Sequence, residues 1–322
     1  MPELPFIFPP IETYQSSAFV LGIMRAHPKY ADILHNGYIK LECKNTKQLS
    51  EMNLMFTDSL WDSFRIWGLA EMNLYNVSNF NKNTLLKFLC ERIDQGNYLL
   101  LYDVDEFYLS YTDNYLLRHF SHDTYVYGYE SGEFMVQAYQ KEHLKLLRVN
   151  MQEIVESLLS KKGRKEISNK RSFCTFRPSI NRDIRLDTKC ILKEIKEFYE
   201  KQSEADKHNE SLFNMDIYEV LIEAMCSIEA GTDADLRPFR CLWEHKKLML
   251  ERIKHLSFNE YSDCWVTLKA LCEKTELIFR LMMKYNMVYQ KMLIERAQRL
   301  LINVKQEELM WYTTYIKQLE GN

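Results

Sequence analysis

The fold of this chain is most readable in residues 98–139, YLLLYDVDEFYLSYTDNYLLRHFSHDTYVYGYESGEFMVQAY. The stretch begins with a largely apolar run, Tyr98–Val104, whose length is typical of a strand in the centre of a sheet. A Tyr-rich polar loop comes next. Two further strand patterns, at 124–130 and 133–139, flank Ser131–Gly132, which fits a two-residue hairpin turn. We therefore predict a strand, a loop and a hairpin in this order.

Composition bounds the class of protein. The chain has 322 residues, of which 46% are hydrophobic and 27% charged, a balance typical of globular proteins with an ample core. The formal net charge of −3 favours neither nucleic acid nor an anionic membrane as a partner. We find no glycine-rich phosphate loop, no signal peptide in MPELPFIFPPIE, and no apolar run near the roughly 18 residues of a membrane span.

The cysteines and histidines predict no metal site. Eight cysteines are spread singly, without a CxxC pair, which favours reduced thiols in a cytoplasmic protein over disulfides or structural zinc. The pairs Glu244-His245 and Glu251-His255 lack the HExxH order that places zinc ligands on one helix face. No cofactor is predicted.

The chain divides into two predicted domains, an α+β domain at 1–180 and a mostly helical domain at 181–322. Helical periodicity and caps predict helices at 14–25, 81–94, 149–159, 187–204, 214–228, 235–256, 259–285 and 287–317. Further strands are predicted at 38–41, 53–56 and 171–178. The two last helices fit an antiparallel pair, and their apolar stripe favours core packing over a partner-binding face.

His122 is the leading candidate for chemistry. It enters the first hairpin strand between Ser121 and Asp123, and a histidine there can act as a general base if an acceptor orients its other ring nitrogen. The alternative is a buried structural histidine bonded to backbone. His119, three residues earlier, is expected to pack or cap.

Partners for His122 are sparse. The start of the first helix offers hydroxyls at Thr13, Ser16 and Ser17, while no cysteine precedes Cys43. A hydroxyl is far less acidic than a thiol, and Thr13 is equally suited to capping the helix. After His122, Gln137 is the amide placed to orient the ring, although an amide cannot offset an imidazolium charge as a carboxylate does.

The Tyr–His block resembles a known family. Segment VDEFYLSYTDNYLLRHFSHDTYVYGYE is similar to the butirosin biosynthesis protein H N-terminal domain family, and the matching positions are Asp105, Tyr108–Tyr111, His119, His122 and Gly128–Tyr129. The element DLRPFRCLWEHK, from Asp235 to Lys246, also resembles a segment that relatives carry later in their chains.

The resemblance implies a papain-like, peptidase C39-like α+β domain with a Cys-His-Asp site. It also implies acyl transfer from a carrier-protein thioester to an amine, in antibiotic or nonribosomal peptide biosynthesis. The family's cysteine would fall at about Thr13 and its aspartate near Gln137–Ala138, so His122 alone carries over as a catalytic position.

Two hypotheses are open at this point. The first is an amide- or ester-forming acyltransferase in which His122 is the base, with Thr13 or Ser16 as a weak nucleophile or with direct attack by the acceptor. Expected partners are an acyl or peptidyl carrier protein and a small-molecule acceptor, with a homodimer left open. The second is a catalytically inactive member, a pseudoenzyme that acts as a scaffold. A peptidase is a weaker third. Substrate contacts are assigned to Asp105, Tyr108, Tyr111 and Tyr129.

Overall fold

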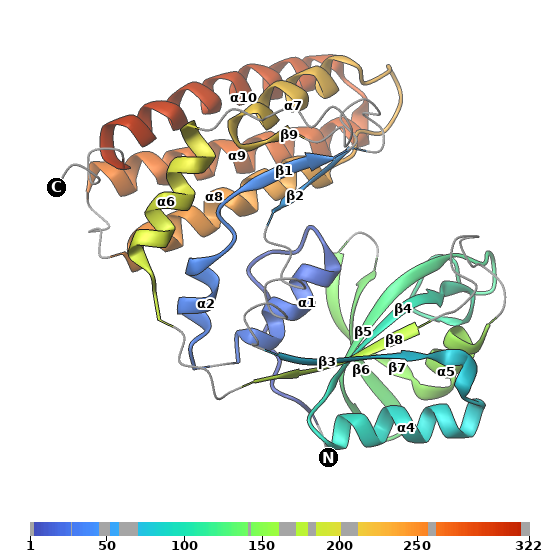
Figure 1. Ribbon diagram of the computed structural model, residues 1–322. Helices are drawn as coiled ribbons and strands as arrows, with labels where there is room; N and C mark the ends of the chain where they lie inside the picture. Colours follow the sequence, from blue (N-terminus) through green and yellow to red (C-terminus); the bar gives the residue numbers. More distant parts are fainter. Residues whose placement is uncertain are drawn as a thin grey trace. The chain divides into compact units, whose positions relative to one another are not determined.

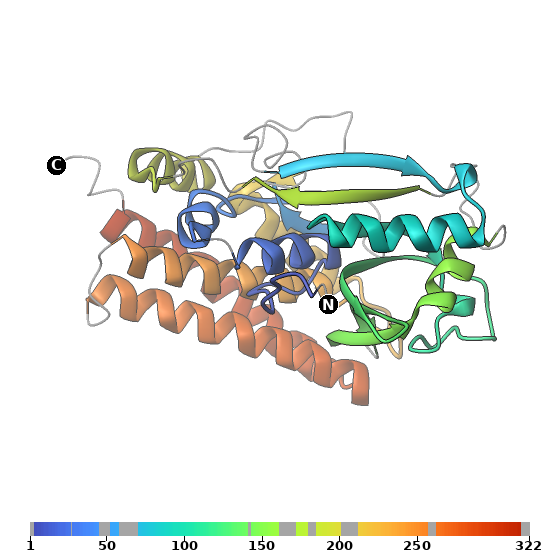
Figure 2. The ribbon, with the colours of Figure 1, turned by 90° about the horizontal axis from the view of Figure 1, so that it is seen from below.

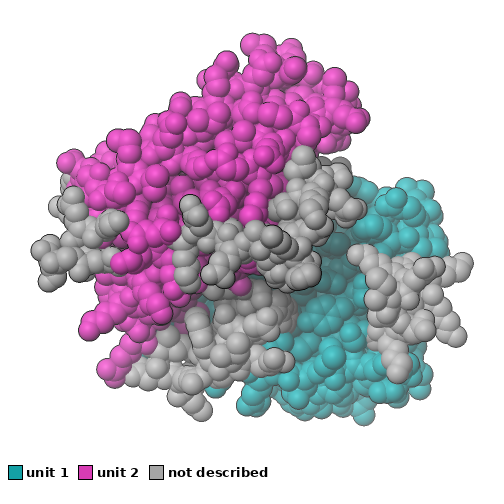
Figure 3. Space-filling view, turned by 45° about the horizontal axis from the view of Figure 1, so that its top comes forward, with its two compact units in different colours: residues 1–30, 60–183 teal, residues 31–59, 184–322 magenta. Residues whose placement is uncertain are grey.

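The computed structural model describes residues 3–26, 28–44, 52–57, 70–140, 143–160, 172–179, 185–200, 212–256 and 262–316. It is a mixed α+β protein with antiparallel sheets, as predicted (Figure 1). The chain forms two compact units, coloured separately in Figure 3. Unit 1 comprises residues 1–30 and 60–183, and unit 2 comprises 31–59 and 184–322. The predicted boundary at 180/181 lies outside the described residues, and residues 31–59, which we grouped with the first domain, belong to unit 2.

Unit 1 contains a six-stranded antiparallel sheet in the order β3-β8-β4-β5-β6-β7. The strands are β3 (Ala70–Asn76), β4 (Tyr98–Asp105), β5 (Ser121–Glu130), β6 (Glu133–Gln140), β7 (His143–Asn150) and β8 (Ser172–Pro178). The predicted central strand and hairpin are therefore confirmed. Ser131 and Gly132 both have positive φ, 52° and 84°, as a two-residue hairpin of the primed type requires.

Helices cover both faces of this sheet. On one face, α4 (Lys82–Asp94) and α5 (Met151–Leu159) enclose an apolar core that includes Leu101, Val126 and Val136. On the other face lies α1 (Gln15–Met24), whose Phe19 stacks on Tyr125 with ring centroids 5.0 Å apart. Adjacent side chains of a strand point to opposite faces, so Tyr125 and Val126 belong to different cores. Figure 2 shows β3 and β8 side by side above α4.

The N-terminal segment of unit 1 is fixed against α1 and β5. The Leu4 N–H donates to the Tyr127 carbonyl (2.9 Å), and the Ile7 N–H donates to the Gly22 carbonyl (3.1 Å). Phe6 stacks on the Tyr127 ring at 4.9 Å. A Cβ at Gly22 would lie 2.3 Å from the Phe6 ring, so this close approach requires glycine.

Unit 2 is mainly helical. Its helices are α2 (Tyr30–Asn36, which begins at the unit boundary), α6 (Thr188–Glu200), α7 (Ile217–Cys226), α8 (Arg237–His255), α9 (Asp263–Val288) and α10 (Lys291–Trp311), the last continuing into a π-helical turn at Tyr312–Ile316. The long pair α9 and α10 lies side by side, as predicted (Figure 2). A small sheet of order β2-β1-β9 joins β1 (Leu41–Lys44), β2 (Asn53–Phe56) and β9 (Leu212–Phe213).

Unit 2 encloses a charged cluster. The side chains of Lys246 and Glu308 pair with no exposed surface on either. Tyr199 (2.6 Å) and Tyr218 donate their hydroxyl protons to the same Glu308 carboxylate. Lys246 Nζ also lies 3.0 Å from His245 Nδ1. The His245 Nε2–H donates to the Ile39 carbonyl at 2.7 Å, which leaves Nδ1 to accept from Lys246.

Several elements differ from the sequence expectation. The strand predicted at 38–41 begins at Leu41, and β3, β7 and α2 were not predicted. The helix predicted from 149 begins at Met151, because β7 runs to Asn150, whose side chain then caps α5 by accepting the Gln152 N–H at 2.8 Å. In the described ranges, no helix is both long and apolar enough to cross a membrane.

Candidate functional site

The candidate site lies where β4 ends and β5 begins. Asp105, the last residue of β4, pairs in register with Ser121, the first residue of β5. The short 3-10 turn η3 (Glu106–Tyr108) and the Tyr-rich loop connect the two strands. This arrangement brings His119 and His122 to the same end of the sheet as two carboxylates, Asp105 and Glu106.

Asp105 and His119 form a hydrogen-bonded dyad. The carboxyl group of Asp105 is completely buried, and its Oδ2 lies 2.9 Å from His119 Nδ1. Ser160 donates its hydroxyl proton to the same oxygen at 2.6 Å, and the Phe107 N–H donates to Oδ1 at 3.2 Å. A carboxylate accepts hydrogen bonds, so Nδ1 of His119 carries the ring proton and Nε2 is the proton-accepting nitrogen.

Two neighbours orient the His119 ring: Asp105 at its edge and Phe107 against its face. It stacks on Phe107 with ring centroids 4.3 Å apart, while its side chain keeps 26% of its surface exposed. The ring is thus held by a buried anion and an aromatic face and still meets solvent. These are the conditions that a general base needs to accept a proton from a bound molecule.

His122 is held more loosely. Its Nδ1 lies 3.8 Å from Glu106 Oε1, which is beyond hydrogen-bond distance, and its side chain is 43% exposed. Its ring lies 6.5 Å from that of Phe120. Glu106 in turn accepts a hydrogen bond from the Asn114 amide at 2.5 Å.

The pleat of β5 separates His122 from the start of α1. Tyr125 faces α1, and Val126 faces the core beneath α4 and α5. By alternation, His122 shares the face of Thr124 and Val126, whereas Asp123 shares the face of Tyr125. The register irregularity in this pair of strands falls in β4, between Leu101 and Val104, so β5 alternates regularly here.

The hydroxyls predicted as nucleophiles lie on the α1 side. Ser16 is a side-chain hydrogen-bond partner of Tyr125, whose own hydroxyl donates to Asp123 at 3.2 Å. Thr13 is buried, and the residue that precedes α1 as its N-cap is Tyr14, not Thr13. Burial raises the pKa of Asp123, and the Asp103 N–H that bonds its Oδ1 at 3.2 Å opposes that shift. The structure therefore brings Ser16 to Tyr125, which in turn bonds Asp123, rather than to His122.

Gln137 also lies on the α1 side. It pairs with Tyr125 across β5 and β6, and its backbone carbonyl accepts from the Gln15 amide at 2.8 Å. The Gln137 side chain is completely buried, and its amide atoms have no hydrogen-bond partner among the described residues. Ala138 faces the opposite core.

The residues predicted to contact substrate fall into two groups. Tyr108 and Tyr111 lie near the dyad: the Tyr108 ring is 6.3 Å from that of His119, and the Tyr111 hydroxyl is 2.8 Å from that of Thr124. Burial raises the pKa of Tyr111. Tyr129 lies near the other end of β5, roughly 20 Å along the strand, where its hydroxyl donates to Asp94 at 2.9 Å.

Sequence reasoning missed the dyad because its members meet through tertiary structure. Asp105 was assigned to substrate binding and His119 to packing. Ser160 follows α5, far along the chain, and no local pattern marks it as a partner of Asp105. The sequence did contain one usable signal. The alternation of side chains along β5 places His122 on the opposite face from the residues that contact α1, which argues against pairing His122 with the hydroxyls of α1.

The cysteines of unit 1 are buried or half-buried and weakly acidic. Burial raises the pKa of both cysteines of unit 1, Cys90 and Cys174, to about 11, so their thiols stay protonated near neutral pH. Within the described ranges, no group of three or more His, Cys, Asp or Glu side chains is placed to hold a metal ion.

Comparison with known proteins adds no family assignment. No protein-family model matches the chain, and no curated protein matches it.

Proposed function

We propose that unit 1 is a papain-like, C39-like domain and that the protein is an acyltransferase of antibiotic or nonribosomal peptide biosynthesis. It would transfer an acyl group from a carrier-protein thioester to an amine or hydroxyl of a small acceptor, in the cytoplasm. Support comes from the antiparallel sheet with α1 against β5 and β6, and from histidines at the start of β5. The observation that carries the proposal is the buried carboxylate of Asp105 on Nδ1 of His119.

The reaction in this proposal uses direct attack by the acceptor. His119 Nε2 takes a proton from the acceptor as its nitrogen or oxygen bonds to the thioester carbonyl carbon. The tetrahedral intermediate then collapses, the carbon–sulfur bond breaks, and the imidazolium returns the proton to the departing thiolate. Asp105 stabilises the imidazolium between these steps. Holding donor and acceptor together supplies much of the rate, so no protein nucleophile is required.

The test is release of thiol from hexanoyl-pantetheine in the presence of a primary amine. We expect His119→Gln and Asp105→Asn each to lower the rate by about 10²–10⁴. His143→Gln is the matched control, because His143 is exposed on β7 of the same unit. Circular dichroism checks that each variant is folded. Full activity of a folded His119→Gln protein would exclude His119 as the base.

His122 provides an internal comparison. It is the histidine that the family resemblance selects, yet its nearest carboxylate is 3.8 Å away. If His122→Gln abolishes thiol release and His119→Gln does not, the base is His122 and the Asp105–His119 dyad is structural.

A second candidate function is a non-catalytic scaffold. The observation that favours it is that the Ser16 hydroxyl is engaged with Tyr125 on the opposite face of the sheet from His122. This hypothesis predicts that wild-type protein releases no thiol above the uncatalysed rate. It also predicts that His119→Gln and wild type retain an acylated carrier protein equally in a pull-down.

A further inference from the structure

Apolar side chains are exposed where α9 ends and α10 begins. Most apolar residues of this helix pair face the core of unit 2, but Met287 and Met292 keep 79% and 67% of their surface exposed. Met283, Val288 and Tyr289 keep 39%, 44% and 45%. We call these five residues the helical tip. Exposed apolar residues gathered in one place mark an interaction surface, and the flexible side chain of methionine adapts readily to a partner.

The loop that precedes α8, residues 227–236, holds the helical tip in place. The Ala234 N–H donates to Asn286 Oδ1 at 2.8 Å, and Asn286 Nδ2 donates back to the Ala234 carbonyl at 2.9 Å. The Tyr289 hydroxyl donates to Asp233 at 2.9 Å. These bonds are formed within one copy of the chain. The surface is therefore preformed, and association would cost little conformational entropy.

The same loop brings negative charge to one border of the helical tip. Its Glu229 and Asp233 are exposed. A third carboxylate, that of Asp235, is already paired with Arg237, whose Nη2 lies 2.6 Å from Asp235 Oδ2. Two exposed carboxylates thus lie on the side where the loop contacts α9.

Helix geometry places positive charge on the other side of the methionines. Successive residues of an α-helix are turned by about 100°, so Met283 and Met287 lie about 60° and 100° around α9 from Asn286, which contacts the loop. Lys284 lies about 160° from Asn286 in the same direction. It is exposed. The order around α9 is therefore acidic loop, methionines, lysine.

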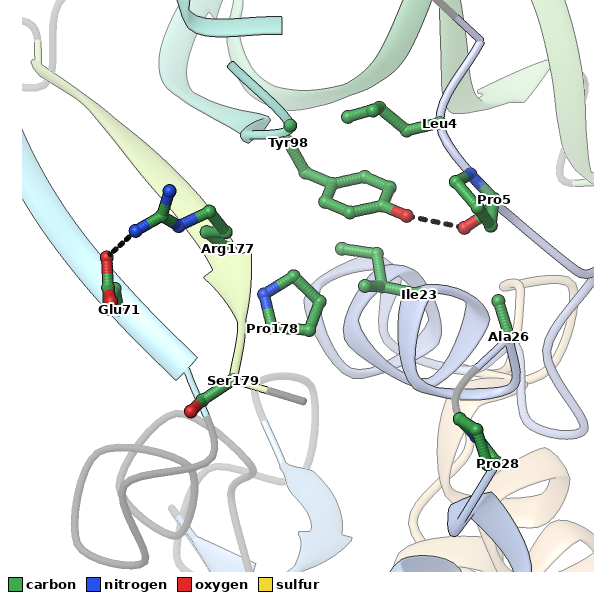
Figure 4. A pocket seen from close by; sticks show the side chains of 11 residues that line it. Leu4, Pro5, Ile23, Ala26, Pro28, Glu71, Tyr98, Arg177, Pro178 and Ser179 are labelled. Carbon is green, nitrogen blue, oxygen red and sulfur yellow. Dashed lines mark hydrogen bonds and ion pairs between the residues drawn. The ribbon is translucent and has the colours of Figure 1, made fainter. Parts of the chain in front are cut away.

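An apolar pocket in unit 1 lacks this arrangement. Its volume is about 490 Å³, and Ile23, Tyr98 and Pro178 contribute to its wall (Figure 4). The ion pair of Glu71 and Arg177 is turned away from these side chains (Figure 4). At the helical tip, in contrast, charges of both signs flank the methionines, and their order indicates what covers them.

We propose that the helical tip is a homodimer interface, covered by a second copy of this chain. A two-fold axis parallel to α9 places the acidic loop of each copy against Lys284 of the other, with the two Met287 side chains at the centre. An axis perpendicular to α9 in the plane of the interface would bring like charges together. An anionic membrane would be repelled by Glu229 and Asp233, whereas a second copy supplies both signs.

The proposed dimer is weak, and it is independent of acyl transfer. Five exposed side chains fall short of the roughly 800 Å² per partner of a standard interface, so we expect a dissociation constant on the order of 10–100 μM. The test is sedimentation velocity of the full chain, from about tenfold below to about tenfold above that value. Wild type should pass from monomer to dimer over this range.

Substitutions should weaken the dimer according to their place. Met287→Asp should weaken association more than about tenfold, because it buries a charge at the centre of the interface. Lys284→Glu and Glu229→Lys should each weaken it about fivefold to tenfold, because each creates like-charge contacts on both sides of the two-fold axis. Lys269→Glu is the matched control. Lys269 is an exposed lysine of the same helix, on the order of 20 Å from Lys284, and its replacement should leave association unchanged.

A mixture of two variants tests the symmetry directly. Lys284→Glu protein mixed with Glu229→Lys protein has an acid facing a base on both sides of the axis, so the mixed dimer should form with an affinity close to that of wild type. Circular dichroism checks that each variant is folded. A mixture that does not associate, wild type that stays monomeric, or undiminished association of Met287→Asp would each overturn the proposal. Monomeric wild type that sediments with phosphatidylglycerol vesicles, when Met287→Asp does not, would make the helical tip a lipid-binding surface instead.

Discussion

Lys246 and Glu308 form an ion pair in which neither side chain has exposed surface. Burial alone would drive the pKa of Lys246 down, and the adjacent Glu308 carboxylate opposes that shift. The same carboxylate accepts hydrogen bonds from Tyr199 and Tyr218. All of these partners depend on one carboxylate of α10, so its removal affects helices from several parts of unit 2.

Replacing Glu308 by Gln should therefore destabilise unit 2 strongly. Lys246 would keep a buried charge without its counter-ion, which costs about 3–5 kcal/mol. Urea unfolding measures the loss. The adjacent Glu307 is the matched control, because it pairs with Lys274 in a partly exposed setting, and Glu307→Gln should cost less than about 1 kcal/mol. An equal decrease in the free energy of unfolding in both variants would show that burial does not determine how much an ion pair contributes to stability.

His35 should make the stability of unit 2 depend on pH. Burial, with Arg252 and His255 nearby, lowers its pKa from 6.5 to about 3. Between these values the unfolded chain binds a proton that the folded chain does not, so stability falls as pH drops below 6.5, by about 1.4 kcal/mol per pH unit. Between pH 6.5 and 5, His35→Gln should therefore reduce the slope of the free energy of unfolding against pH by about 1.4 kcal/mol per pH unit. The exposed His143→Gln should leave the slope unchanged, and an unaltered slope in His35→Gln would contradict this prediction.

Gly22→Ala should displace the N-terminal segment from α1. The new methyl group would lie 2.3 Å from the Phe6 ring, and relief of such a clash costs about 1–3 kcal/mol, which exceeds the helix-propensity gain of up to about 1 kcal/mol. Thermal unfolding and limited proteolysis report the displacement. Adding Phe6→Ala should reduce the clash, so the cost of Gly22→Ala should be smaller in the Phe6→Ala background than in wild type.

Two serines near the dyad should contribute unequally to the stability of the protein. Ser160 donates to the Asp105 carboxylate, and Ser157 donates to the Asp105 backbone carbonyl at 2.9 Å. Hydrogen bonds to charged groups contribute about 1.5–3 kcal/mol and neutral ones about 1, so Ser160→Ala should be the more destabilising. The NMR signal of the His119 Nδ1 proton should move in Ser160→Ala and stay in place in Ser157→Ala. The opposite order would show that Ser160 does not help to orient the dyad.

Local sequence was sufficient for the elements whose signals are local. Asn81 is followed by a helical apolar pattern, and the structure places a capping box there, in which Asn81 and Thr84 exchange hydrogen bonds. The hairpin at Ser131–Gly132 likewise depends on two adjacent residues that tolerate positive φ. In contrast, β3 alternates weakly and owes its place to pairing with β8, nearly a hundred residues later.

The candidate site was less predictable than the fold. Proximity in sequence drew attention to His122 and the hydroxyls of α1, but the pleat of β5 places His122 and Asp123 on opposite faces. Which histidine meets Asp105 depends on how the Tyr-rich loop closes over Phe107 and on where Ser160 follows α5. These are tertiary relationships that spacing alone does not encode.

The interleaving of the two units along the chain constrains how the protein is made. Residues 31–59 belong to unit 2 but are synthesised before residues 60–183, which make up most of unit 1. Strand β1 pairs with β2 along one edge and with β9 along the other, and β9 leaves the ribosome some 170 residues later. During that interval the second edge of β1 lacks its native partner. A fragment that begins at residue 184 would lack two of the three strands of its own sheet. Dissection of this protein into independently expressed halves should therefore preserve residues 31–59 with the helical part, as a permuted or co-expressed segment.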